Sequence, residues 1–271
     1  MNTGRCLLGL LLTAAVFGAD ADYRAEIERW RAGVERSLKT DDGWLTVAGL
    51  FWLKEGENRI DLPEGSGPAP VFEFHGGKTT VRLAGQAARD LKPDTSGKPD
   101  IVAIGSVSMF VIKRGDRYGV RLKDRNSRFR QNFAGCKWFP VRESAKVEAR
   151  LIPYSPPKMI TIPNVLGQKE QMPSPGRVVF TWQGQEVGLE PVWSGRQLWF
   201  IFKDRTSGKE TYPAGRFLYA GAPVDGKVTI DFNKAVNPPC AFTPYATCPL
   251  PPRQNWLPVR IDAGELTYHA E

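Results

Sequence analysis

The chain has 271 residues, of which 41% are hydrophobic and 24% are charged, and its formal net charge is +8. This length and composition can bury a sizeable core, which excludes a disordered protein and a fold that depends on metal or dense disulfides. The positive charge is scattered, apart from one run between Arg121 and Arg130. Mild, scattered basicity is typical of surface charge that keeps a protein soluble, so no nucleic-acid partner is expected.

The N-terminus has the pattern of a secretory signal peptide. Arg5 gives a positive start, residues 6–18 form an apolar run, and residues 19–21 read Ala-Asp-Ala, a small-x-small cleavage site. The run is too short to span a bilayer comfortably. The pattern therefore predicts that residues 1–21 are removed and that the protein is secreted or periplasmic, with no stable membrane insertion.

One helix is predicted next, within residues 22–43. Its apolar residues are spaced four, three, four and four apart, which places them on one face: Tyr23, Ile27, Trp30, Val34 and Leu38. Charged residues occupy the other face. This amphipathic pattern predicts a helix that packs against a folded body.

Short strands are predicted in the rest of the chain. Three pairs flank turn signals and predict hairpins: residues 71–74 with 79–83, 107–113 with 118–123, and 178–182 with 186–189. Other candidates are residues 101–104, 147–152, 198–203, 216–219 and 227–232. With 27 Gly and 22 Pro, the pattern predicts an all-β fold, a sandwich or barrel of many short antiparallel strands with one N-terminal helix. Proline punctuates residues 153–175, which predicts a long connection beside a cleft.

The most informative segment is the proline-rich stretch of residues 231–255. Its prolines fix φ and remove backbone donors, so it predicts a stiff surface loop rather than a helix or a central strand. A rigid loop with polar side chains is a common place for function. Either its polar residues contact a small polar or anionic ligand, or they satisfy backbone groups inside the loop. The candidates are Asp231, Asn233, Asn237, Tyr245 and Asn255, with Tyr212 and Arg216 as neighbours.

Three cysteines remain after the predicted cleavage. In an oxidising compartment the close pair, Cys240 and Cys248, predicts a disulfide, and Cys136 lies outside it, near Trp138. Zinc needs clustered Cys and His, and this pair has no histidine nearby, so no metal is expected. Because no phosphate loop or dinucleotide fingerprint is visible, no cofactor is expected either.

Three segments are similar to a known family. They are residues 129–140 (FRQNFAGCKWFP), residues 209–217 (KETYPAGRF) and the loop of residues 231–255. Together they resemble the bacterial and archaeal domain-of-unknown-function 1684 family, with a likeness over roughly residues 40–268. The resemblance implies no established activity and identifies no catalytic residue.

A weaker likeness lies within residues 50–113. Residues 56–60, 97–99, 104–106 and 110–112 resemble a reduced forkhead-associated β-sandwich. Members of that class read phosphothreonine through an Arg and a Ser-x-x-His, and residues 61–70 lack this pattern. The resemblance therefore implies a shared strand scaffold rather than phosphopeptide binding.

These observations predict four parts: a signal peptide (1–21), an amphipathic helix (22–43), a small forkhead-associated-like β subdomain (44–113) and a larger β domain (114–271). Two classes of function stay open. The first is a soluble, exported binding or structural protein with a polar site around residues 231–255. The second is a hydrolase or lyase whose carboxylates, Asp231 with Asp204 or Glu265, act in a cleft. A Ser-His-Asp site is not expected, because neither histidine lies in a nucleophile-elbow pattern.

Overall fold

The computed structural model describes the backbone of residues 9–268 and the side chains of residues 21–268. The chain forms two compact units. The small unit consists of Ser37–Ala134 and Pro239–Cys248, and the large unit consists of the helix up to Arg36, Gly135–Pro238 and Pro249–Tyr268. The loop segment of residues 239–248 therefore belongs to the small unit although both of its flanks belong to the large one.

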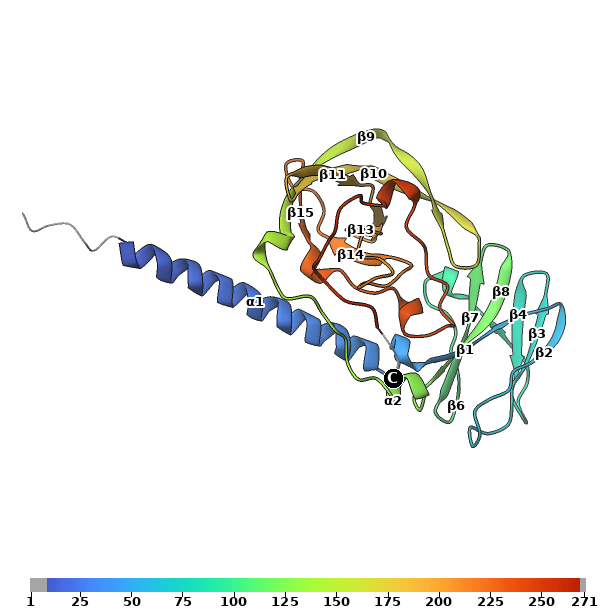
Figure 1. The fold of residues 1–271 in the computed structure, drawn as a ribbon. Helices are drawn as coiled ribbons and strands as arrows, with labels where there is room; N and C mark the ends of the chain where they lie inside the picture. The colour runs from blue at the N-terminus through green and yellow to red at the C-terminus, as the bar shows by residue number, and fades with distance from the viewer. Residues whose placement is uncertain (1–8, 269–271) are drawn as a thin grey trace, which may run out of the picture. The chain divides into compact units, whose positions relative to one another are not determined.

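The small unit is built from two antiparallel four-stranded sheets (Figure 1). One has the order β1 (Val47–Trp52), β8 (Arg117–Asp124), β7 (Val107–Arg114) and β6 (Val102–Ile104). The other has the order β2 (Gly56–Arg59), β3 (Val71–His75), β4 (Lys78–Arg82) and β5 (Arg89–Leu91). One hydrophobic cluster joins side chains of both sheets, such as Phe72 of β3 and Met109 of β7. The unit is thus a small β-sandwich, and the predicted boundary at residue 113 falls between its paired strands β7 and β8.

The large unit contains a four-stranded and a three-stranded antiparallel sheet. The first has the order β11 (Gln185–Leu189), β10 (Lys169–Trp182), β9 (Lys146–Pro163) and β15 (Lys227–Asp231). The second has the order β12 (Val192–Ser194), β13 (Gln197–Phe202) and β14 (Arg216–Ala220). Phe180 of β10, Phe200 of β13 and Leu218 of β14 belong to one buried cluster between the sheets. The prediction of an all-β fold of antiparallel strands is confirmed.

The three predicted hairpins are confirmed as the pairs β3–β4, β7–β8 and β10–β11. The β3–β4 turn shows why the signal was reliable. Gly76 and Gly77 have φ of +54° and +86°, and only glycine adopts this region without strain. The Gly-Gly pair therefore allows the tight turn that brings His75 opposite Lys78.

The predicted connection over residues 153–175 is wrong. This segment forms most of two long paired strands, β9 and β10, which face each other from Lys169 opposite Pro163 down to Val179 opposite Arg150 (Figure 1). β15 pairs with β9 only over Lys146–Arg150. Among the described residues, no other strand pairs with the outer edges of this distal two-stranded ribbon, and only the Leu250 amide bonds its end, at the Pro163 carbonyl, at 2.7 Å. Proline is tolerated at such edges because no ladder donor is lost.

The helix α1 (Gly9–Lys39) contains the predicted residues 23–38 and extends further towards the N-terminus. Ile27 is fully buried, and the Trp30 ring packs edge-on against Trp138 at 5.9 Å. Beyond α1, the described residues form only the four-residue helix α2 (Arg128–Gln131) and short 3-10 turns. Among the described residues, no helix is long and apolar enough to cross a membrane. Residues 1–8 of the predicted signal peptide lie outside the described residues.

The segment of residues 231–255 is irregular, as predicted, with three 3-10 turns at Phe232–Lys234, Pro239–Ala241 and Arg253–Asn255. Most of its side chains are buried or half-buried, so the prediction of a surface loop is wrong. The physical reason is that proline has no N–H to satisfy and that buried Asn side chains bond the remaining backbone groups.

Candidate ligand-binding site

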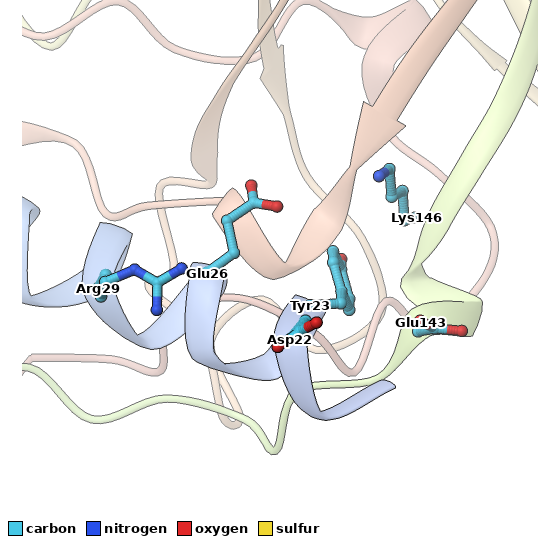
Figure 2. Close-up of a pocket in the computed structure, with 6 residues that line it drawn as sticks. All are labelled: Asp22, Tyr23, Glu26, Arg29, Glu143 and Lys146. Atoms are coloured by element: carbon cyan, nitrogen blue, oxygen red, sulfur yellow. The ribbon is translucent and has the colours of Figure 1, made fainter. Parts of the chain in front are cut away.

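A polar pocket lies in the large unit, where α1 meets the start of β9. It is a cavity of about 570 Å³ lined by Asp22, Tyr23, Glu26, Arg29, Glu143 and Lys146. Figure 2 shows the first four projecting from α1 and the last two coming from the segment that opens β9. We call this cavity the Tyr23 pocket. Its wall combines three carboxylates with two cations, so it can bind both donor and acceptor groups of a ligand.

Tyr23 is held by residues more than two hundred positions away in the sequence. Its hydroxyl donates a hydrogen bond to Oδ1 of Asp231 at 3.0 Å and accepts one from Nδ2 of Asn233 at 3.0 Å. Asn233 is fully buried. Its amide also bonds the backbone of Arg142, donating to the carbonyl oxygen at 2.8 Å and accepting from the amide nitrogen at 3.1 Å. The network fixes Tyr23, and with it α1, to the β body.

Within the described part of the chain, one oxygen of Asp231 has no hydrogen-bond donor. Oδ1 accepts from Tyr23 and from the backbone amide of Asn233 at 3.1 Å, whereas the buried Oδ2 accepts no hydrogen bond. The nearest cation is Lys234, whose Nζ lies 3.7 Å from Oδ2 and 2.8 Å from Oε1 of Glu26. A buried carboxylate oxygen with no donor is able to accept one from a ligand.

Burial raises the pKa of the Tyr23 hydroxyl above its ordinary value, and the negative charge of Asp231 and the hydrogen bond to it raise the pKa further. Tyr23 therefore keeps its proton and acts as a donor to Asp231. The Lys146 ammonium lies 5.2 Å from the centre of the Tyr23 ring. Lys146 is also the strand partner of Asp231, so the Tyr23 ring lies close to this cation and its hydroxyl bonds the neighbouring carboxylate.

Asn237 and Glu265 form a second buried pair, distinct from Asp231 and Asn233. The Asn237 amide nitrogen donates to Oε2 of Glu265 at 2.7 Å, and its side-chain nitrogen donates to the carbonyl of Leu266 at 2.8 Å. Burial raises the pKa of Glu265 to about 7, although hydrogen bonds from Asn237 and from the Cys136 side chain oppose the rise. Asn237 thereby ties the C-terminal segment to the body.

Arg216 is fully buried in a third cluster. It donates to the carbonyl oxygens of Ala263 and, at 3.0 Å, of Ile261, and its Nη2 lies 3.4 Å from Oδ2 of Asp204. The same Asp204 oxygen accepts from the Ile261 amide at 2.5 Å. Arg216 thus links β14 to the backbone of residues 261–263 and to Asp204. Because only 1% of its surface is exposed, it offers no surface to a ligand.

The other predicted residues are placed separately. Asn255 is buried and bonds three backbone groups, at Glu190 (both its amide and its carbonyl) and at Ile201. Tyr212 is half-buried, and its carbonyl accepts from the Gly215 amide at 3.0 Å.

Tyr245 belongs to the small unit, where its ring packs edge-on to Phe129 at 6.4 Å. Of the predicted set, Asp231 and Asn233 bond Tyr23 of the pocket wall, and ligand binding by the predicted residues stays a prediction.

The structure does not show the predicted disulfide. Among the described residues, no two cysteines are joined by a bridge. The Sγ atom of Cys248 instead accepts a hydrogen bond from the Cys240 amide at 3.2 Å. Hydrogen bonding with the Cys240 side chain and burial raise the pKa of the Cys248 thiol. The two side chains are therefore neighbours, and the bridge itself stays a prediction.

The carboxylates proposed for acid–base catalysis occupy different places. Asp204 and Glu265 both act on the charge of buried Arg216, whereas Asp231 bonds Tyr23 and Asn233. Neither Asp204 nor Glu265 lines the Tyr23 pocket. Within the described part of the chain, no group of three or more His, Cys, Asp or Glu side chains is arranged to hold a metal ion.

Sequence reasoning missed the residues of the pocket wall. Tyr23 was assigned to the apolar stripe of the helix, and a signal was present, because a buried tyrosine hydroxyl usually needs a polar partner. The partner could not be found from spacing, since Tyr23 and Asp231 are 208 residues apart. Glu26, Arg29 and Lys146 carry no local motif at all.

The fold and the site define an all-β protein with a polar pocket between its N-terminal helix and a β-sheet. The chain belongs to the family described as "Protein of unknown function (DUF1684)", which matches residues 131–266. This confirms the resemblance seen in the sequence, over a shorter range than the expected residues 40–268.

One solved structure with sequence similarity is the solution NMR structure of the uncharacterized protein from gene locus rrnAC0354 of Haloarcula marismortui. It is 28% identical, with a TM-score of 0.43, and the match covers 51% of this chain and 79% of that chain. No curated protein matches the chain.

Proposed function

We propose that this protein is exported and binds a small polar ligand in the Tyr23 pocket, without catalysing a reaction. Export would follow from the signal peptide predicted in residues 1–21, and the oxidising compartment would convert Cys240 and Cys248 to a disulfide. The observation that carries the binding proposal is the Tyr23–Asp231–Asn233 network, which presents a fixed tyrosine in a pocket of mixed charge.

The pocket chemistry favours a hydroxyl-bearing organic acid. Arg29 and Lys146 can bind a carboxylate, and the carboxylates of Asp22 and Glu143 can accept hydrogen bonds from hydroxyl groups. Glu26 is already engaged by Lys234 at 2.8 Å, so it contributes less to the ligand. Such a ligand matches both signs of charge on the pocket wall.

Carboxylate catalysis is the competing proposal, and one feature favours it. The raised pKa of Glu265, about 7, suits a general acid–base group. However, Glu265 has 0% of its surface exposed, and a general acid must reach the proton that it transfers. We therefore favour binding over hydrolysis or lyase chemistry.

A ligand-stabilisation measurement tests the binding proposal. The thermal midpoint would be measured with sodium gluconate, with glucose and with sodium chloride at matched ionic strength. Gluconate at about 100 times its Kd is expected to stabilise the protein by about 2.7 kcal/mol. Lys146→Met should abolish the gluconate effect, because it removes a cation of the pocket. The matched control is Lys169→Met, an exposed lysine of β10, and it should keep the effect.

The proposal fails if gluconate and glucose leave the midpoint where chloride leaves it. It also fails if Lys146→Met retains the whole gluconate effect, because the stabilisation would then arise elsewhere.

A further inference from the structure

Among the residues that the structure describes, a buried arginine of the small unit has no ion-pair partner. Arg121 lies in β8, and 4% of its surface is exposed. Its guanidinium has five N–H donors. The hydrogen bond that it makes is a long one, from Nη2 to Oγ1 of Thr247 at 3.4 Å, and its Nε is buried without an acceptor. Buried charges are normally paired because the loss of hydration is costly, so this arrangement calls for a counter-charge.

Asp94, a carboxylate that acts on the charge of Arg121, is paired with another arginine. Oδ2 of Asp94 lies 2.7 Å from Nη1 of Arg114, and Oδ1 of Asp94 accepts from the Lys113 amide at 2.9 Å. Burial, and then repulsion from Arg114, lower the pKa of Arg121 to about 10. Arg121 is therefore still a cation at neutral pH.

Two further neighbours of Arg121, Cys248 and Trp44, carry no charge, whereas Lys123 is a second cation close enough to interact with it. Cys248 interacts with Arg121, and its sulfur is neutral in either state, because the raised pKa keeps the thiol protonated and a disulfide sulfur carries no charge. The guanidinium carbon lies 5.2 Å from the centre of the Trp44 ring, whose face attracts the cation. An aromatic face offers no in-plane acceptor for the N–H groups, so the hydrogen-bonding capacity of Arg121 stays available.

Thr247 supplies a further donor at the same place. Its Oγ1 accepts from Nε of Arg114 at 3.0 Å and from Nη2 of Arg121 at 3.4 Å. Because two N–H groups occupy the acceptor side of this hydroxyl, its own hydrogen is directed away from them and can be donated. The donors of Arg121 and Thr247 thus meet at one point of the small unit.

We propose that Arg121 and Thr247 form a binding site for a small oxyanion, either a carboxylate or a phosphate group. The planar fork of an arginine matches two oxygens of either group, and the hydroxyl of Thr247 adds a third contact. The bound anion supplies the counter-charge that Arg121 lacks among the described residues. This site belongs to the small unit, and it is independent of the Tyr23 pocket in the large unit.

Thermal midpoints measured with anions provide the test. The protein would be compared in sodium phosphate, sodium acetate and sodium chloride at matched ionic strength. A specific anion at about 100 times its Kd should raise the midpoint by at least about 3 °C over chloride. Arg121→Met should remove this rise. Arg117→Met is the matched control: Arg117 lies in the same strand and is exposed, with its guanidinium 3.9 Å from the Trp52 ring centre, so the rise should persist.

A calorimetric titration of phosphate and of acetate gives a second readout. Thr247→Val keeps the side-chain shape but removes one hydrogen bond to the anion, so the affinity should fall about tenfold. This variant also decides the question if Arg121→Met does not fold. If phosphate binds, the anion is a phosphate group; if acetate binds, it is a carboxylate.

The proposal is overturned if neither anion raises the midpoint above chloride, because water alone would then satisfy Arg121. It is also overturned if Arg121→Met keeps the rise, or if Thr247→Val binds the anion with unchanged affinity.

Discussion

The titration of one buried carboxyl group should be visible in the stability of the protein. Glu265 has a pKa raised from 4.5 to about 7, chiefly by burial. Between these pH values the folded protein holds a proton that the unfolded chain has released. The stability that comes from the neutral form is therefore complete below pH 4.5 and is lost as the pH rises through about 7. A shift of this size corresponds to about 3 kcal/mol.

We therefore predict that Glu265→Gln reduces the pH dependence of stability. Glutamine is neutral at every pH and similar in shape, so the variant should be more stable than the parent above about pH 8, by up to about 3 kcal/mol. Urea denaturation at several values between about pH 5 and pH 8 provides the measurement. The exposed Glu170→Gln serves as the control. Parallel pH profiles for the parent and Glu265→Gln would contradict the prediction.

Other buried polar residues show why spacing alone could not identify a site. Arg216 and Asn255 had the chemistry of ligand contacts, yet both bind backbone groups of distant segments. Arg121 stood in a basic run that was interpreted as surface charge, whereas it is buried. Residue type indicates what a side chain can bond, but burial and the partner depend on tertiary pairings that one sequence does not contain.

At the level of elements, the sequence correctly predicted those strand pairs whose two strands follow each other directly in the chain. The three hairpins were predictable because turn residues and alternating strands lie next to each other in the sequence. The β9–β10 ribbon was missed because its prolines were counted against strand formation. Proline disfavours central strands because it removes a hydrogen bond to a neighbouring strand. In the distal ribbon each strand pairs on one side, so a proline on the outer edge removes no such bond. How the segment of residues 239–248 joins the small unit depends on long-range contacts, such as the Thr243 hydroxyl bonded to the Val47 carbonyl at 2.8 Å.

The same segment carries a prediction about its cysteines. Because Sγ of Cys248 lies 3.2 Å from the Cys240 amide nitrogen, the two cysteines are neighbours, and we expect a bridge between them in an oxidising compartment. Closing so short a loop should stabilise the protein by ~2.5 kcal/mol on the chain-entropy estimate. Cys240→Ser should therefore lower the unfolding free energy of the oxidised protein by that amount or less.

Thiol counting under denaturing conditions provides the direct check on the bridge. The oxidised protein without residues 1–21 should present one reactive thiol, at Cys136. Three reactive thiols would mean that packing and proline hold the loop. Cys136→Ser is the control, because it should leave the oxidised protein with no reactive thiol and with its bridge intact.

At the scale of the whole molecule, the sequence predicted the class of fold and the family, and it placed the end of the small β subdomain at residue 113, whereas the main segment of the small unit runs from Ser37 to Ala134. Strand-rich patterning was sufficient for the class, since it depends on local periodicity. The division into units follows from which sheets share a core, and one core combines β3 and β4 with β7 and β8. These strands are separated in the chain by a stretch that carries no signal of the pairing.

Export is the last prediction. If residues 1–21 are a signal peptide, protein recovered from the cell envelope or the medium should begin at residue 19, 20 or 22, after cleavage at Gly18, Ala19 or Ala21. Cleavage after Ala21 would place the new ammonium group on Asp22, which lines the Tyr23 pocket. The ammonium would then add a positive charge beside Arg29 and strengthen the binding of a carboxylate. Intact-mass measurement decides the position. A retained Met1 would contradict export by this route, and a purified variant beginning at Ala25 should lose the gluconate effect, because it lacks Tyr23.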